Sequence, residues 1–297
     1  MIKIAMLGCD SSHTETYAGL MNVKESPFYG KARVEWLWGI DVKQAREKAA
    51  KLNISMVCEN IGDAIVNADL VMVLGRYGDD HFLPAKLAVE AGKTVYVDKP
   101  FTNNFAEALA LATLAKENKV RLMSFSAYRF SKEFEETCAF FNSLKNPIGA
   151  VFSCPADCKD IADDRVKDIH WYGVHVTDLL TSLITVGVKS VKVTKSEQSL
   201  WVNVVFKNGW CATLCFPYHA DDFIHWTVMG REQSMHKSID ISGDYYQRSL
   251  DFVLRNTDRN NKFEFSISHT CESIAILDAI VASQKENKEI ILETYEI

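Results

Sequence analysis

The stretch Thr94–Asn104, TVYVDKPFTNN, decides the fold of this chain. Its residues 95–97 are β-branched or aromatic and carry no charge, so they predict the end of a buried strand. Asp98 and Lys99 follow at the strand tip. Pro100 favours an extended backbone at Lys99, and the bond before a proline can be cis. Open α/β sheets bind ligands at the carboxyl ends of their strands, so Lys99 either faces a ligand or is an ordinary loop lysine.

This stretch resembles the Glu-Lys-Pro signature of the Gfo/Idh/MocA family, which groups glucose-fructose oxidoreductase, inositol dehydrogenase and related sugar dehydrogenases. Asp98 stands where the family has glutamate. Residues 69–74, His81 and the segment AVEAGKT at 88–94 follow the spacing of the family's fourth and fifth strands. The resemblance covers essentially the whole chain.

The resemblance implies an α/β protein of two domains. Residues 1–125 are expected to form an N-terminal Rossmann domain with a doubly wound parallel sheet. Residues 126–297 are expected to form a C-terminal α+β domain with an open, mostly antiparallel sheet. The 297 residues are enough for two cores of this kind.

Composition indicates an ordinary soluble globular protein, with 47% hydrophobic and 24% charged residues. A net charge of −6 argues against a nucleic-acid or anionic-membrane surface. No apolar run approaches the length of a membrane span, and the first residues predict a strand rather than a signal peptide. We therefore expect a cytoplasmic protein that binds neither nucleic acid nor membranes.

The eight cysteines are scattered along the chain. The pairs Cys154/Cys158 and Cys211/Cys215 have a C-x3-C spacing, which is not the usual zinc spacing. Free buried thiols in a reducing cytoplasm are the preferred interpretation, and disulfides are the alternative.

The N-terminal segment predicts the strand, turn and helix that open a dinucleotide fold. A short apolar strand, residues 2–7, ends at Gly8, and the turn GCDSSH lacks the later glycines of G-x-G-x-x-G. Ser11 and Ser12 could offer hydroxyl and backbone N–H groups to a pyrophosphate, although Asp10 would oppose its charge. Alternatively, Asp10 or Ser12 only caps the helix.

Asp41 stands at the end of the second predicted strand, residues 33–40. An acid in this position accepts the ribose hydroxyls of NAD and repels the extra phosphate of NADP, so NAD is the expected cofactor. The alternative is that Asp41 only caps the helix 42–52. His81 matches a histidine that the family often has after the strand 67–74, although it could equally be a helix-start histidine bonded to backbone. The resemblance also places Asp98, Lys99 and Pro100 at the cofactor.

The second catalytic element that the resemblance implies is a Gly-x-His-x-x-Asp helix within residues 168–183, where His175 would transfer the proton. Trp171 stands where most members have an aspartate, and a tryptophan carries no charge and accepts no strong hydrogen bond. His170 or Asp168 could substitute if the backbone presents either of them to the cleft. The resemblance places Lys99, Arg129, Tyr172 and His175 at the substrate.

The segment from Lys189 onward predicts an open sheet, with strands at 191–195, 199–206, 211–217 and 225–230 and a hairpin turn at Asn208-Gly209. One face of that sheet is expected to cover helices. The other face is expected to carry Trp201, Trp210, Phe216 and Trp226 and to pair with another subunit in a homodimer or homotetramer. Stacking of sugar rings is the alternative role for these tryptophans.

Together these patterns predict an NAD-dependent oxidoreductase that transfers hydride between nicotinamide and a sugar- or polyol-like substrate. By resemblance His175 is the base, and Lys99 stabilises the developing alkoxide. No metal is expected, because the lysine supplies the positive charge. The alternative function is a sensor or regulator of the same fold that binds a dinucleotide or sugar without turning it over.

Overall fold

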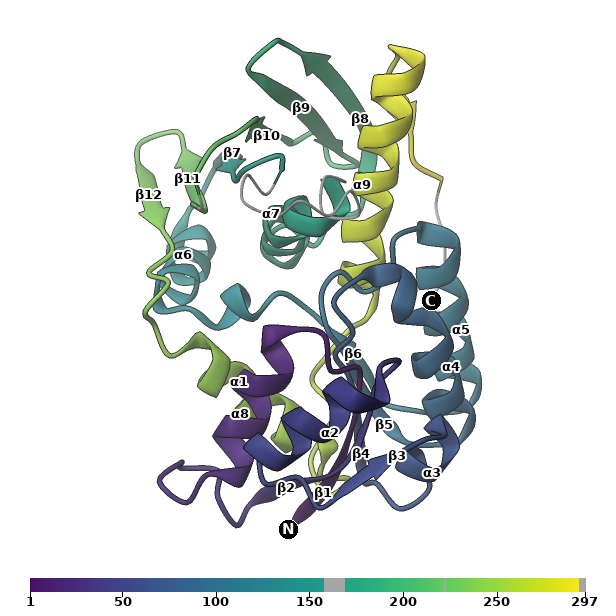
Figure 1. The fold of residues 1–297 in the computed structure, drawn as a ribbon. Helices are drawn as coiled ribbons and strands as arrows, with labels where there is room; N and C mark the ends of the chain where they lie inside the picture. Colours follow the sequence, from purple (N-terminus) through teal and green to yellow (C-terminus); the bar gives the residue numbers. More distant parts are fainter. Residues whose placement is uncertain (158–168, 222, 294–297) are drawn as a thin grey trace.

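The computed structural model describes residues 1–157, 169–221 and 223–293, and its helices flank two β-sheets (Figure 1). The first sheet has the strand order β3-β2-β1-β4-β5-β6 and is parallel throughout. Its strands are β1 (Ile2–Leu7), β2 (Ala32–Trp38), β3 (Met56–Cys58), β4 (Leu70–Val73), β5 (Thr94–Val97) and β6 (Leu122–Ser124). Strands β4 and β5 are buried along their whole length, which explains their continuous apolar sequence.

Helices cover both faces of this sheet. One face carries α3 (Ile61–Ile65), α4 (Phe82–Glu90) and α5 (Phe105–Glu117). The other carries α1 (Ser12–Asn22), α2 (Val42–Lys51) and a helix from far along the chain, α8 (Tyr245–Thr257). Leu250 and Val253 of α8 are fully buried in the same core cluster as residues of α1 and α2. A segment of the C-terminal half therefore completes a helical layer of the N-terminal sheet.

The second sheet has the order β12-β11-β7-β10-β9-β8-β13, and the pairing of β7 with β10 is its one parallel contact among the described strands. Its strands are β7 (Pro147–Ser153), β8 (Val188–Lys195), β9 (Ser199–Phe206), β10 (Cys211–Pro217), β11 (His225–Gly230), β12 (Ser234–Ser238) and β13 (Ile290–Ile291). Gly209, with φ +86°, lies in the turn between β9 and β10 as predicted. The predicted fold class is confirmed: a parallel Rossmann sheet and a separate, mostly antiparallel sheet.

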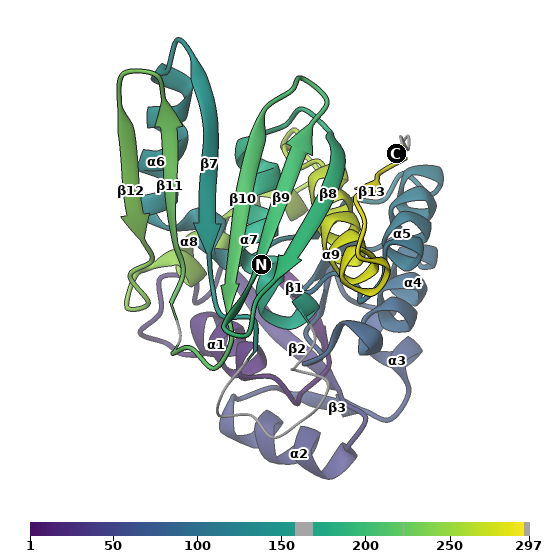
Figure 2. The same ribbon diagram turned by 90° about the horizontal axis from the view of Figure 1, so that it is seen from above.

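Three helices pack on the second sheet: in Figure 2 the first two lie behind its strands and the third lies beside β8. They are α6 (Lys132–Ser143), α7 (Ile169–Leu183) and α9 (Ser268–Glu286). Two short 3-10 turns, η1 (Gly78–Asp80) and η2 (Ala127–Phe130), lie in the loops after β4 and β6. The division at residue 125 stays a prediction, since α8 lies beyond it in sequence and yet packs on the first sheet.

The prediction that four aromatic residues share the outer face of the second sheet is wrong. Phe216 and Trp226 point inward and are 0% and 1% exposed, and Trp226 Nε1 donates to Thr137 Oγ1 of α6 at 2.8 Å. Trp210 is half-buried against Phe141. Trp201 alone of the four is exposed, at 48%. Successive residues of a strand face opposite sides, so residues grouped by composition need not share a face.

Among the described residues no helix is long and apolar enough to cross a membrane. The described cysteines are all free thiols, and Cys158 lies outside the described residues.

Candidate functional site

Lys99 lies at the tip of β5 and packs on Trp171 of α7. Its Nζ is 4.3 Å from the centroid of the indole ring, within cation–π distance. The guanidinium of Arg76 lies 5.8 Å from the same ring. The Lys99–Pro100 peptide bond is cis. The strand tip of the first sheet and the helix of the second domain therefore meet at one tryptophan.

His175 lies on α7 and is only 8% exposed. Its Nδ1 is 2.8 Å from Ser126 Oγ, and its ring packs on Tyr128 and Tyr172 at centroid distances of 4.8 and 5.4 Å. Burial, and then the charges of Lys99 and His13, hold the pKa of His175 well below its usual value. The histidine is therefore neutral, and its role as the proton-transferring residue stays a prediction.

Asp98, next to Lys99, is 3% exposed and bonds His13 of α1. The distance from Asp98 Oδ2 to His13 Nδ1 is 2.5 Å. On the other side of the ring, His13 Nε2 lies 2.7 Å from the hydroxyl of Tyr246 on α8. Burial alone would raise the pKa of Asp98, but the charge and hydrogen bond of His13, with Lys99 and His81, hold it below the usual value. Asp98 is thus a buried carboxylate.

Of the two residues expected to substitute for the aspartate that Trp171 replaces, only His170 lies among the described residues. His170 is buried and points to α9, where its Nε2 is 2.8 Å from Asp278 Oδ1. Asp168 lies outside the described residues. Trp171 itself packs on Tyr77 of the loop after β4.

Arg129 and Tyr172, both predicted at the substrate, have different surroundings. The guanidinium of Arg129 forms two 2.5 Å bonds with the Asp178 carboxylate, which also accepts the backbone N–H of Ser126 at 3.0 Å. Arg129 therefore anchors η2 to α7. Tyr172 packs edge-on against the ring of His175. That both contact substrate stays a prediction.

A cavity of about 300 Å³ lies at the carboxyl ends of β1, β2 and β4. It is lined by residues of the first turn and of the neighbouring strand ends, including Gly8, Cys9, Asp10, Asp41, Gln44 and Gly75. Gly8 has φ +108°, and a Cβ there would lie 2.3 Å from Gly75 N. A glycine is therefore required where the two loops meet, even though the later glycines of the motif are absent.

The polar groups around this cavity fit a dinucleotide in part. Ser11, not Asp10 or Ser12, caps α1, because its side chain accepts the N–H of His13 at 3.1 Å. Ser12 begins the helix and is exposed, so its hydroxyl is accessible. Asp10 is turned toward the loop after β4 and accepts the N–H of Arg76 at 3.2 Å.

Asp41 is exposed and caps α2. Its Oδ1 accepts the N–H groups of Lys43 and Gln44 at 2.9 and 3.2 Å. The predicted capping role is therefore present, and Oδ2, for which the described residues supply no hydrogen bond, remains to accept a ribose hydroxyl. The two roles do not exclude each other.

His81 is completely buried between two loops. Its Nδ1 lies 2.7 Å from the carbonyl of Pro100 and its Nε2 lies 2.8 Å from the carbonyl of Gly75. His81 is therefore bonded to backbone, which was the alternative interpretation of this residue. Its two hydrogen bonds connect the loops after β4 and β5. Pro100 takes part through its carbonyl, and direct contact of either residue with a cofactor stays a prediction.

Sequence reasoning did not assign a role to His13 or to Tyr246. His13 is the last residue of the GCDSSH turn, and a histidine there faces the tip of β5 in a parallel sheet. Tyr246 belongs to the Tyr245-Tyr246 pair that begins α8, a helix that was not predicted. The position of Tyr246 beside His13 depends on contact between segments more than 230 residues apart, which no local pattern predicts.

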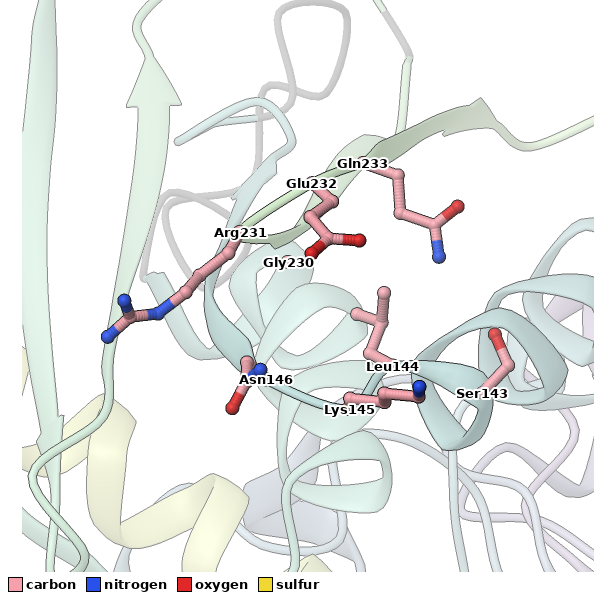
Figure 3. A pocket seen from close by; sticks show the side chains of 8 residues that line it. All are labelled: Ser143, Leu144, Lys145, Asn146, Gly230, Arg231, Glu232 and Gln233. Carbon is pink, nitrogen blue, oxygen red and sulfur yellow. The ribbon is translucent and has the colours of Figure 1, made fainter.

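A second pocket, of about 190 Å³, lies between the end of α6 and the turn joining β11 to β12 (Figure 3). Its lining is mostly exposed, and none of the residues described above takes part in it. Within residues 1–157, 169–221 and 223–293, no group of three His, Cys, Asp or Glu residues is placed to hold a metal ion. That the reaction needs no metal stays a prediction.

Comparison with known families gives a match for the N-terminal part of the chain. Residues 2–126 match the sequence model of an oxidoreductase family with an NAD-binding Rossmann fold, the Gfo/Idh/MocA family. This match over residues 2–126 agrees with the family resemblance of the sequence. An uncharacterized oxidoreductase of Escherichia coli, YhhX, is 41% identical over 64 residues, which are 22% of this chain and 19% of that protein. A second, YdgJ, is 44% identical over 68 residues and is again covered over 19% of its length.

Solved structures share the complete fold. The myo-inositol dehydrogenase of Lactobacillus casei, in complex with NAD(H) and myo-inositol, superimposes with a TM-score of 0.86 at 12% identity, over 100% of this chain and 98% of that one. A putative myo-inositol dehydrogenase of Sinorhizobium meliloti superimposes with a TM-score of 0.83 at 16% identity, over 99% and 100%. At these identities the likeness shows the fold and does not identify the substrate.

Proposed function

We propose that this protein is an NAD-dependent oxidoreductase acting on the carbinol group of a sugar or polyol. The observation that supports this most is that Lys99 of the first domain packs on Trp171 of α7, the helix that also carries His175. The charge of Lys99 helps to lower the pKa of His175. Inositol dehydrogenases share this fold, and this supports a polyhydroxylated substrate for the present protein.

The nicotinamide would supply hydride transfer when bound. Asp41 would hold the ribose hydroxyls, and the N–H groups at the start of α1, with Ser12, would face the pyrophosphate. Lys99 would stabilise the oxyanion that develops as the hydroxyl loses its proton. His175, bonded through Nδ1 to Ser126, would present Nε2 to the substrate.

The first test is NAD reduction by the purified protein against a panel of sugars and inositols, with NADH binding followed by fluorescence. For the alcohol that is oxidised fastest, Lys99→Met should lower kcat by roughly 10²–10⁴ and leave NADH binding intact. Lys93→Met is the matched control, because Lys93 precedes the other end of β5 and bonds the Val66 carbonyl. Turnover of Lys99→Met within about threefold of the parent would refute the assignment.

The second candidate is a regulator that binds the same ligands without turnover. Trp171 favours it, because the indole takes the place of an acid and contacts Lys99 directly. A regulator would bind NADH and a sugar with measurable affinity, and it would reduce no NAD with any member of the panel.

A further inference from the structure

Two side chains of α2 bond the turn that joins β1 to α1. Gln44 Oε1 accepts the thiol of Cys9 at 3.4 Å, and Lys48 Nζ donates to the Ser11 carbonyl at 3.0 Å. Gln44 and Lys48 are four residues apart on the helix, so they lie on the same face of it. The two residues that they bond stand on either side of Asp10 in the chain. Helix α2 therefore holds the turn at two points.

This turn borders the cavity of about 300 Å³ at the carboxyl ends of the first sheet. Cys9, Asp10 and Gln44 line the cavity, and so does Asp41, the proposed ribose ligand. The bond between Gln44 and Cys9 is thus part of the cavity wall. The Ser11 carbonyl, which Lys48 holds, follows Asp10 directly in the chain. The bonds from α2 therefore fix the backbone on both sides of a residue that lines the cavity.

Side chains, rather than glycines, hold this turn in place. In the motif G-x-G-x-x-G the second glycine lets the backbone approach the pyrophosphate, and the third allows the helix to pack closely on the strand. Asp10 and His13 stand at these two positions. Asp10 bonds the loop after β4, where its Oδ1 accepts the N–H of Arg76 at 3.2 Å. The bonds from α2 add to this one.

Lys48 acts on the peptide group at which α1 begins. The Ser11 carbonyl and the Ser12 N–H belong to one planar, trans peptide group, so they point in opposite directions. The first N–H groups of a helix have no partner within the helix, and they bind anions well. By holding the carbonyl, Lys48 fixes the direction of the Ser12 N–H.

The ammonium of Lys48 also brings positive charge to the turn. Its side chain is 16% exposed, and its charge opposes the rise in the pKa of the Cys9 thiol that burial, and then Asp10, cause. Glu15 pairs with both Lys48 and Lys51, at 3.4 and 3.2 Å. Two lysines and one glutamate carry one net positive charge. This charge lies beside a turn that carries the carboxylate of Asp10.

We propose that Lys48 positions the pyrophosphate of the dinucleotide, by holding the Ser11–Ser12 peptide group and by offsetting the charge of Asp10. The inference rests on the proposed function, because it needs a dinucleotide in this cavity. Lys48 is a positioning residue, since it acts on the phosphate groups through the turn. Gln44 supports the same turn at Cys9.

The test compares three ligands in titrations of the full chain: NADH, ADP, which keeps the diphosphate, and adenosine, which lacks it. Lys48→Met should weaken the binding of NADH and of ADP by roughly tenfold to a hundredfold, because a hydrogen bond from a charged group is lost. Adenosine should bind within about twofold of the parent value, because it carries no phosphate. Lys48→Arg keeps the charge and should restore most of the ADP binding.

Lys51→Met is the matched control. It removes the same charge from the same helix and from the same Glu15 carboxylate, and the Lys51 side chain is 67% exposed. It should bind all three ligands within about twofold of the parent values. Urea unfolding shows whether each variant is folded at the temperature of the titrations.

The outcomes separate this inference from the proposed function. If Lys48→Met binds ADP as tightly as Lys51→Met does, the inference is overturned and the proposed function stands. An equal loss for ADP and adenosine would also overturn it, because Lys48 would then only maintain the shape of the cavity. If the expected losses are found and the parent oxidises no alcohol, the inference stands and the regulator is favoured. A parent that binds none of the three ligands refutes both.

Discussion

At the scale of single residues, Asp41 uses one carboxylate oxygen as a helix cap, and the proposed function assigns the other to cofactor specificity. Its Oδ1 caps α2 through the N–H groups of Lys43 and Gln44. The capping role explains why an acid stands at this position. The proposed preference of the protein for NAD depends on the other oxygen, Oδ2. An asparagine can keep the first role and lose the second, which allows the two to be separated.

We predict that Asp41→Asn weakens the preference for NADH over NADPH by about tenfold or more, because it removes the charge that repels the extra phosphate. Its unfolding free energy should match that of the parent. Asp41→Ala should show the same change in preference and lose about 0.5–2 kcal/mol of stability with the cap. Fluorescence titration of both cofactors and urea unfolding measure the two effects. An unchanged preference in Asp41→Asn would remove Asp41 from the ribose site.

His175 makes stability depend on pH. The unfolded chain binds a proton at this ring near its usual value of 6.5, whereas burial, with the charges of Lys99 and His13, lowers the pKa in the folded protein well below that. The unfolded state therefore binds more protons between the two values. The stabilisation is present above pH 6.5 and is lost as the pH falls through the folded pKa.

We therefore predict that the unfolding free energy falls below pH 6.5, by at most about 1.4 kcal/mol per pH unit from this group. Urea unfolding of the parent and of His175→Asn at several pH values tests this. The variant should show a shallower fall. Parallel curves for the two proteins would mean that His175 titrates alike in both states.

At the scale of elements, the Arg129–Asp178 pair fixes α7 against η2. Both side chains are largely buried, with 11% and 2% of their surface exposed. The same carboxylate holds the N–H of Ser126, and Ser126 in turn bonds His175. The pair thus sets the position of His175 through one intermediate residue.

We predict that Arg129→Ala loses about 3–5 kcal/mol of unfolding free energy, because it leaves the Asp178 carboxylate buried without its partner. Arg255→Ala is the control, since its pair with Asp251 is more than half exposed and should contribute less than about 1 kcal/mol. Urea unfolding measures both. If Arg129→Ala retains full stability and only raises the KM of the substrate, Arg129 is the substrate ligand that the family resemblance implies.

At the scale of the whole molecule, the described helices leave the outer face of the second sheet uncovered (Figure 2). Trp201 is exposed on this face, and it pairs across the strands with Thr194 and Cys215. Val205 and Val151 are half-buried on the same side. The apolar area is smaller than the sequence suggests, because Phe216 and Trp226 face inward.

We predict that this face forms a homo-oligomer, so the particle should exceed the monomer mass of 33.5 kDa in sedimentation at micromolar concentration. Trp201→Glu should shift the protein toward monomer. Ile241→Glu, which changes an exposed residue outside this sheet, should not. A parent that sediments as a monomer contradicts the prediction.

Local patterns predicted much of the fold and part of the site. The buried strand before Lys99, the parallel sheet and the hairpin at Gly209 follow from apolar runs and turn residues that act over a few positions. The inward orientation of Phe216 and Trp226 was missed, because alternation along a strand does not say which face a sheet buries. Helix α8 was missed because its apolar face belongs to a core formed by the other domain.

The sequence by itself determined that Lys99 ends a buried strand and that His175 lies on a helix of a second domain, since short-range patterns and family spacing carry that information. Only the tertiary structure decided which side chains meet there. Trp171 lies against Lys99, Arg129 is held by Asp178, and His13 links Asp98 to Tyr246. These contacts join segments far apart in the chain, and a hydrogen bond depends on distances of a few tenths of an ångström that no local pattern sets.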